Sequence, residues 1–136
     1  MYSITELIPQ RAPIIMVDEF LGIGDDGLSR SRFTVRADNI FVANGVLDEC
    51  GVIEHIAQTA AARIGYICRE HGREVPLGYI GSVNDFRLFS HPAAGETIVT
   101  AIEIIQEVFS ISLIGAYCCV GECRKAECRM KICLER

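Results

Sequence analysis

The sequence predicts an α+β fold in which an antiparallel sheet wraps around one long helix. Residues 48–71 place apolar side chains at the three- and four-residue spacing of a helix that covers a core. Residues 76–134 instead contain long segments of alternating apolar and polar residues separated by short turns, which is typical of antiparallel strands. The 136 residues contain no repeat, low-complexity segment or linker, so we expect a single domain spanning residues 1–136.

The long helix is expected to begin near Asp48 and to end around His71 and Gly72. Aspartate is a favourable N-cap residue, and glycine suits the position after the last turn. A rotation of about 100° per residue places one set of apolar residues on a single broad side, which we assign to the core. This set is Val52, Ile53, Ile56, Ala60, Ile64 and Ile67.

The opposite side of this helix carries small residues where a surface helix would carry charged ones. Glu54 and Gln58 are its two polar side chains, and their four-residue spacing makes them neighbours. Small residues indicate that something packs closely against this side: a partner subunit, a sheet or a ligand. The members of this side are Gly51, Glu54, Gln58, Ala61, Ala62 and Gly65.

Shorter patterns predict the elements around the helix. A helical turn at residues 4–7 is followed by Pro9 and Pro13, which interrupt regular structure. The sequence Asp25-Asp26-Gly27 predicts a hairpin between residues 20–23 and 28–35, and residues 38–45 are expected to form a loop. Further strands are expected at residues 76–89, 96–108, 109–113 and 122–134. The last has one apolar face, formed by Ala126, Cys128, Met130, Ile132 and Leu134.

The composition indicates a cytoplasmic oligomer. Apolar residues make up 50% of the chain and the mean hydropathy is +0.28, yet no apolar run is long enough to predict a membrane span. The first ten residues lack the features of a signal peptide. We therefore attribute the excess hydrophobicity to a buried subunit interface or an acyl-binding groove. A net charge of −5 and a pI of about 5.2 argue against nucleic acid as the principal partner.

Seven cysteines are expected to remain thiols, because an odd number cannot pair completely. Only Cys119 and Cys123 have the spacing of a zinc-ligand pair, and residues on one face of a strand diverge along its length. Cys128 falls into the apolar register of its strand. We therefore interpret the cysteines as small hydrophobic residues and expect no metal site and no cofactor.

Several motifs resemble those of the hotdog-fold 3-hydroxyacyl-ACP dehydratases. Residues 7–18 (LIPQRAPIIMVD) resemble the family's opening L-P-H-R-x-P-x-L-L-V-D, and residues 54–58 (EHIAQ) resemble the E-x-M-A-Q of its central helix. Residues 84–96 are similar to its N-x-R-F…P…G-D segment. Residues 38–41 (DNIF) ahead of the helix are most similar to the dehydratase-like proteins of aryl-polyene and related polyketide-type pathways.

This resemblance implies a hotdog homodimer, or an oligomer built from such dimers, whose two sheets join and whose acyl tunnels lie at the subunit interface. It implies an acyl substrate carried on the phosphopantetheine arm of acyl carrier protein, in a fatty-acid or polyketide-type pathway. It also marks Glu54 as the match to the catalytic carboxylate and Gln58 as its neighbour. In an apolar groove Glu54 can take the role of the acid that protonates the departing C3 hydroxyl.

One departure concerns the second catalytic residue of the family. The standard dehydratases carry a histidine in a G-H-F-P-G loop, fourteen residues before the helix glutamate. That position is Ile40 here, and the histidine of the opening motif is replaced by Gln10. The usual pair of catalytic residues is therefore incomplete in this chain.

Gln58 and four further residues are candidate substrate contacts. Gly45 and Gly81 can present backbone N–H groups to a thioester carbonyl, and Asn44 precedes the first of them. His55 lies about 100° around the helix from Glu54 and is expected on the helix flank or at an interface, with substrate contact as the alternative.

Three functions remain open at this point. The first is a dehydratase in which Glu54 acts with a water molecule or an unusual second residue. The second is an acyl-ACP or acyl-CoA thioesterase, in which the helix carboxylate activates water. The third is a non-catalytic acyl-binding subunit that pairs with an active partner.

Overall fold

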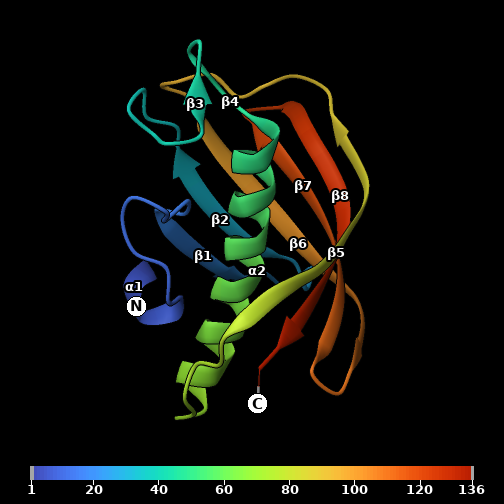
Figure 1. Ribbon diagram of the computed structural model, residues 1–136. Coiled ribbons are helices and arrows are strands. Elements are labelled where there is room, and N and C mark those ends of the chain that lie inside the picture. The colour runs from blue at the N-terminus through green and yellow to red at the C-terminus, as the bar shows by residue number, and fades with distance from the viewer. Residues whose placement is uncertain (1, 136) are drawn as a thin grey trace.

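The computed structural model describes residues 2–135 and has the predicted α+β architecture. One long helix, α2 (Glu49–Glu70), lies across one face of a six-stranded antiparallel sheet with the order β1-β2-β6-β7-β8-β5 (Figure 1). A short helix, α1 (Ile4–Leu7), precedes the sheet. The strands are β1 (Glu19–Ile23), β2 (Ser29–Thr34), β5 (Gly78–Leu88), β6 (Thr97–Val108), β7 (Ile111–Val120) and β8 (Cys123–Leu134).

Both ends of α2 lie where the sequence predicts them. The Asp48 side chain accepts a hydrogen bond from the backbone N–H of Gly51, which is otherwise without a helical partner. At the other end His71 is the C-cap residue, and Gly72 follows it with a φ of +66°, a conformation that glycine adopts without strain.

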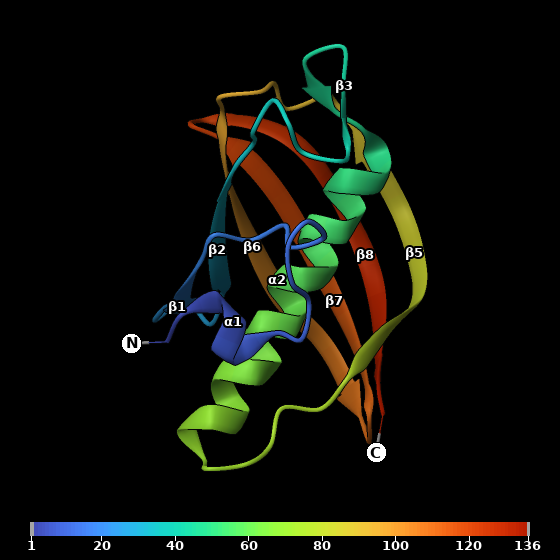
Figure 2. The ribbon, with the colours of Figure 1, turned by 60° about the vertical axis from the view of Figure 1, so that its left-hand side comes forward.

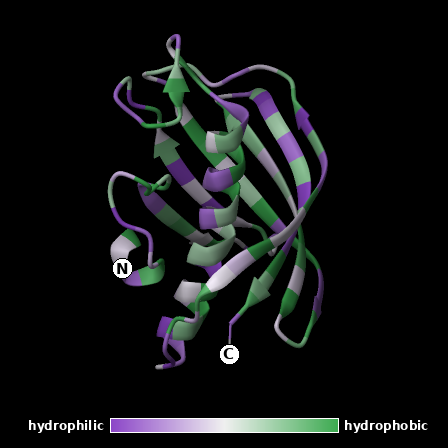
Figure 3. Ribbon diagram, viewed as in Figure 1, coloured by the Kyte–Doolittle hydropathy of each residue, from purple (hydrophilic) through white to green (hydrophobic). Residues whose placement is uncertain are grey.

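The core lies between α2 and the inner face of the sheet. Hydrophilic and hydrophobic residues alternate along β8, as Figure 3 shows, and the apolar positions of this strand point toward the helix. The predicted apolar face of residues 122–134 is therefore confirmed. The large side chains that are fully buried here include Met16, Leu47, Ile56, Ile98, Ile102, Ile114 and Met130.

The predicted loop at residues 38–45 contains a small hairpin instead. Strands β3 (Val42–Ala43) and β4 (Val46–Leu47) pair across a two-residue turn, Asn44-Gly45. These two residues have φ values of 55° and 78°. A two-residue hairpin turn of this kind requires positive φ at both central positions, and Asn-Gly is its preferred sequence. The short length of the flanking strands hides this signal in the sequence.

Part of the small-residue side of α2 is covered by other segments of the same chain. Figure 2 shows α1 and the loop after it lying along α2, on the other side of the helix from β5. A Cβ atom added to Gly65 would lie 2.0 Å from the Leu7 carbonyl oxygen, and one added to Gly51 would lie 2.6 Å from Phe41 Cβ. The close packing inferred from the sequence is present, but these glycines make room for the chain itself rather than for a partner, a sheet or a ligand.

The strand β5 forms one edge of the sheet and pairs only with β8. Its pairing has two irregularities, and it presents large apolar side chains to solvent, with Tyr79 at 55% exposure and Ile80 at 41%. An exposed edge with apolar side chains is a common site for pairing with another chain. None of the helices within residues 2–135 has the length and apolar character needed to cross a membrane.

Candidate active site

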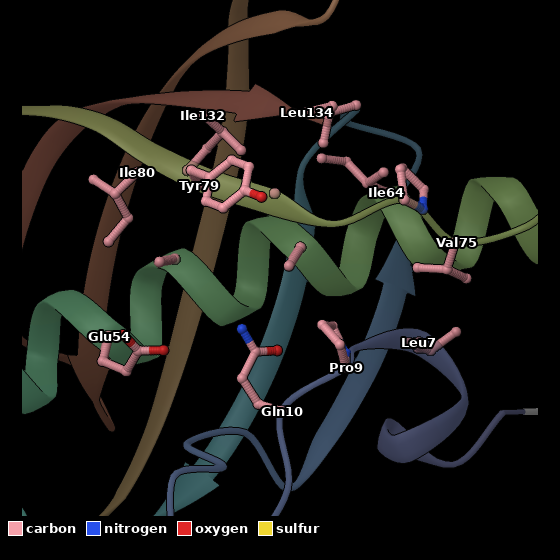
Figure 4. A pocket seen from close by; sticks show the side chains of 14 residues that line it. Leu7, Pro9, Gln10, Glu54, Ile64, Val75, Tyr79, Ile80, Ile132 and Leu134 are labelled. Carbon is pink, nitrogen blue, oxygen red and sulfur yellow. The ribbon is translucent and has the colours of Figure 1, made fainter. Parts of the chain in front are cut away.

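A groove of about 360 Å³ runs along α2 between the N-terminal segment and β5 (Figure 4). Its walls are mainly apolar, and the polar side chains that reach it are those of Gln10, Glu54 and Tyr79. The apolar residues that line it are Leu7, Pro9, Ala57, Ala61, Ile64, Val75, Pro76, Ile80, Ile132 and Leu134. A groove of this shape suits an extended apolar chain that is handled by a few polar groups.

Glu54 projects into this groove from the second turn of α2, where it is partly buried. Its Oε2 accepts a hydrogen bond of 2.7 Å from Gln58 Nε2. Within residues 2–135 its Oε1 has no hydrogen-bond partner. The carboxylate is therefore held through one oxygen, and the other remains able to exchange a proton with a ligand.

Gln58 is fully buried, and its orientation is determined by three hydrogen bonds. Its Oε1 accepts from the Met16 N–H at 2.6 Å, and its Nε2 donates to the Ile14 carbonyl at 2.9 Å as well as to Glu54. Because the Met16 N–H can only donate and the Ile14 carbonyl can only accept, the positions of Oε1 and Nε2 in the Gln58 amide cannot be exchanged by a flip. Gln58 therefore fixes the Glu54 carboxylate and also joins the N-terminal segment to α2.

His55 lies in the core, which corrects the prediction that it contacts substrate or lies on the helix flank. Its Nδ1 donates to the Met16 carbonyl at 2.7 Å, so its Nε2 accepts from the Thr100 hydroxyl at 2.7 Å. The ring also stacks on Phe33, with 5.6 Å between centroids. Burial lowers the pKa of His55 to about 4, against the opposing effect of its bond to Met16. Helical spacing cannot reveal this, because polar residues are normally assigned to the solvent.

Asn44, Gly45 and Gly81 do not line the groove. The first two form the β3–β4 turn, which explains their identities without a ligand. A Cβ atom added to Gly81 would lie 2.9 Å from Cys133 Sγ, so this glycine accommodates a neighbouring strand. Substrate contact by these three residues stays a prediction.

No histidine lines the groove within the described part of the chain. Ile40, at the position of the family's loop histidine, is 50% exposed. His91 Nδ1 is 2.7 Å from the Leu47 carbonyl oxygen, and His71 is an exposed helix cap. The other titratable side chain at the groove is Tyr79, whose hydroxyl donates to Glu135, and this bond raises the pKa of the phenol.

The cysteines are all free, and within residues 2–135 no group of three or more His, Cys, Asp or Glu residues is arranged to hold a metal ion. Burial raises the pKa of the Cys118 thiol to about 12 and that of Cys128 to about 11. Both therefore pack as small apolar side chains, as predicted, and Cys128 does so in the strand register that the sequence indicates.

The family of this chain is established by its sequence as a whole. The family model described as ApeP-like, ApeP dehydratase, matches residues 2–132. This protein belongs to the ApeP-like dehydratase family. The resemblance recognised in residues 7–18 and 54–58 is thereby confirmed. Comparison with curated proteins finds no match.

Solved structures give the fold of this ApeP-like protein. It is similar to the dehydratase heterocomplex ApeI:P from Xenorhabdus doucetiae, with a TM-score of 0.92 and 15% identity over 100% of this chain and 93% of that chain. It is also similar to a probable thioesterase from Bartonella henselae, with a TM-score of 0.64 and 12% identity over 80% and 90% of the two chains. A hypothetical thioesterase with coenzyme A from Streptococcus pneumoniae TIGR4 has a TM-score of 0.66 and 8% identity over 86% and 84%. The fold is the hotdog fold, as predicted.

Two groove residues were not identified as site residues from the sequence. Gln10 was noted only as the replacement of a family histidine, and Tyr79 belongs to no motif. Gln10 occupies a motif position and could have been found there. Tyr79 reaches the groove because β5 is bent beside α2, which depends on the fold as a whole.

Proposed function

We propose that this ApeP-like protein is a dehydratase subunit that acts on 3-hydroxyacyl thioesters, with Glu54 as its catalytic residue. The observation that carries the proposal is the Glu54 carboxylate, which is fixed by Gln58 and directed into an apolar groove in a member of a dehydratase family. An apolar groove suits the acyl chain, and a fixed carboxylate suits proton transfer at the carbons next to the thioester.

The reaction requires one proton transfer at C2 and one at the oxygen atom attached to C3. A base removes a proton from C2, the C3–O bond breaks, and the departing hydroxyl takes up a proton to leave as water, so that a C2=C3 double bond forms. The Glu54 carboxylate can accept the C2 proton and deliver it to the departing oxygen, which restores the carboxylate. Gln58 keeps one carboxylate oxygen in place during both transfers.

We further propose that the working unit is a dimer joined along β5. This edge strand exposes Tyr79 and Ile80, and it forms one wall of the groove beside Glu54. A partner paired with this edge would cover the groove and could add a catalytic group that this chain lacks at Ile40. The predicted partner is a second copy. The name of the ApeI:P heterocomplex supports a different subunit as the alternative.

Acyl carrier protein is the proposed carrier of the substrate, which implies a fatty-acid or polyketide-type pathway in the cytoplasm. The open side of the groove is consistent with a substrate that enters on a long arm and remains attached to its carrier. Coenzyme A thioesters fit the same geometry, so both carriers belong in the test.

The test is to incubate the protein with 3-hydroxyacyl-ACP, alone and with a candidate partner subunit, and to measure both enoyl product and free thiol. Glu54→Gln should lower enoyl formation by at least about 100-fold, whereas Glu103→Gln, an exposed control on β6, should leave it unchanged. Full turnover in Glu54→Gln would refute the assignment of Glu54.

Other products identify the alternative functions. Release of free thiol without enoyl product would establish a thioesterase, which the groove's single carboxylate and the thioesterase neighbours make a specific second candidate. Absence of both products with this chain alone, together with dehydration in the presence of the partner, would establish a subunit that depends on the partner's catalytic group.

A further inference from the structure

The groove along α2 has two distinct ends. Figure 4 shows Glu54 near one end, and Leu7, Ile64 and Val75 together at the other. Ile64 lies about three turns further along α2 than Glu54, roughly 15 Å away along the helix axis. Small apolar residues of α2 line the wall between them. An extended chain whose reacting carbons lie at Glu54 therefore has its far end near Ile64.

A second, narrower space lies beside this far end, between α2 and the sheet. It is lined mainly by isoleucine side chains of β6, β7 and β8, and it leaves no room for a water molecule. Its polar lining residues are Ser112, whose hydroxyl donates to Glu107 at 3.1 Å, and the partly exposed Arg63. Such a space suits the end of a hydrocarbon chain better than it suits water.

Ile64 and Ile132 separate the groove from the narrow space. Both side chains line both of them, and among residues 2–135 these two alone do so. They come from facing elements, α2 and β8, and Ile64 packs against the core cluster that contains Ile132. The barrier therefore consists of two branched side chains, and shortening one of them would join the two spaces.

We propose that Ile64 and Ile132 determine the length of the acyl chain that this protein accepts. The inference rests on the proposed function, because it takes the groove as the site of the acyl chain. The chain runs from Glu54 along α2, and its methyl end stops against the two isoleucines. The narrow space behind them stays closed to the chain while both side chains are present.

The polarity of the groove determines the direction of the chain. An acyl thioester has an apolar acyl chain on one side and a pantetheine arm with amide groups on the other. Amide groups need hydrogen-bond partners when they leave water. Beyond Glu54, the wall of α2 presents Ala57, Ala61 and Ile64, whose side chains offer none. The acyl chain therefore occupies this part of the groove, and the pantetheine arm leaves at the Glu54 end.

The expected selectivity follows from the burial of methylene groups. Each methylene group that moves from water into an apolar site strengthens binding roughly fourfold. Affinity should therefore rise with chain length until the methyl end reaches Ile64 and Ile132, and should then stop rising. In Ile64→Ala two further methylene groups can enter the narrow space, so the rise should continue by about tenfold in total before it stops.

The experiment measures binding rather than turnover. Saturated thioether analogues of acyl-pantetheine, which cannot be hydrolysed, are titrated into the protein by calorimetry in a series that lengthens by two methylene groups at a time. Ile64→Ala should move the length limit to longer chains, and Ile64→Phe should move it to shorter ones. Ile53→Ala is the matched control, since Ile53 is a partly buried isoleucine of α2 that packs against the same core cluster but lines neither space. It should leave the limit unchanged.

The outcomes separate this inference from the proposed function. The length-limiting role is refuted by an unchanged limit in Ile64→Ala, by an equal shift in Ile53→Ala, or by the absence of a limit or of binding in the unaltered protein. The turnover assay of Glu54→Gln still judges the function in each case. A limit that moves as expected, without any dehydration of 3-hydroxyacyl thioesters, would support the acyl site and refute the dehydratase. Ile132→Val replaces Ile64→Ala if that variant unfolds, and it should move the limit in the same direction.

Discussion

Glu54 and His55 are adjacent in the sequence and have opposite environments. Both ring nitrogens of His55 are paired, with the Met16 carbonyl and the Thr100 hydroxyl, and the ring is fully buried. Glu54 is paired through one oxygen and faces a groove with the other. The hydrogen-bonding groups of the core residue are therefore all paired within the chain, whereas those of the residue at the groove are paired only in part.

The side chains of Gln58 on α2 and Gln10 in the N-terminal segment differ in a similar way. Gln58 uses both atoms of its amide, in bonds to Met16, Ile14 and Glu54. Gln10 uses neither atom, although its oxygen is buried. Because the two residues have the same side chain, the difference in their hydrogen bonding comes from their positions in the fold.

The largest expected effect is a difference in the free energy of unfolding between two variants, one at His55 and one at Glu54. His55→Ala should lower the free energy of unfolding by roughly 3 kcal/mol or more, since it leaves two buried groups unpaired and opens a cavity beside Phe33. Glu54→Gln should change the free energy of unfolding by less than about 1 kcal/mol, because an amide can take the place of a half-exposed carboxylate. Chemical denaturation followed by circular dichroism measures both. Similar destabilisation in the two variants would remove the contrast.

The second largest expected effect is the dependence of folding stability on pH, which comes from His55. His55 has a pKa of about 4 in the folded protein and 6.5 as a free side chain, so below pH 6.5 the unfolded chain binds the extra proton first. Stability should therefore fall as the pH falls from about 6.5 toward 4, by roughly 2 kcal/mol at pH 5. Denaturation at pH 7.5 and pH 5 tests this. His55→Asn should lose most of the dependence, and His71→Gln, an exposed control, should retain it.

The contact between α2 and the N-terminal segment should give a moderate effect. Gly65→Ala places a Cβ atom against the Leu7 carbonyl, and it should destabilise the protein by roughly 1–3 kcal/mol. Gly115→Ala is the control, because its Cβ would lie 3.5 Å from the nearest side-chain atom, an ordinary contact. Thermal denaturation compares the two. A smaller loss in Gly65→Ala than in the control would show that the segment is not packed against α2 as described.

The last prediction concerns thiol reactivity, involves no change in stability, and extends the contrast to cysteine. Cys50 and Cys123 are exposed, whereas burial raises the pKa of both Cys118 and Cys128. Iodoacetamide should therefore alkylate the exposed pair at least about 100-fold faster than the buried pair in the folded protein. Peptide mass spectrometry after timed quenching measures the rates. Equal rates for all four thiols, seen in the folded protein as in denaturant, would contradict the burial.

Local signals explain which features the sequence could predict. Asp48 and Gly72 act within one helical turn, so the ends of α2 follow from the residues themselves. The alternation along β8 depends only on the two-residue period of a strand. The position of Glu54 on a face with Gln58 follows from helical geometry in the same way.

Features that depend on distant segments were not predictable. The burial of His55 requires Met16 and Thr100, which lie 39 and 45 residues away along the chain. The role of Gly65 requires Leu7, which comes from an element that precedes the helix. Sequence periodicity reveals that the second face of α2 is close-packed, but it cannot identify what covers it, because small residues fit a subunit, a ligand or a loop equally well.

The N-terminal segment has a consequence for how this groove can diversify. Residues 2–17 contribute no strand to the main sheet. They are held to α2 by hydrogen bonds from Gln58, His55 and Arg69 and by the close packing of Leu7 against Gly65. The part of this segment that lines the groove, residues 7–10, therefore lies outside the sheet, whereas Met16 near its end belongs to the core. Its length and composition can be altered, and the range of acyl chains retuned, without breaking a hydrogen bond of the sheet.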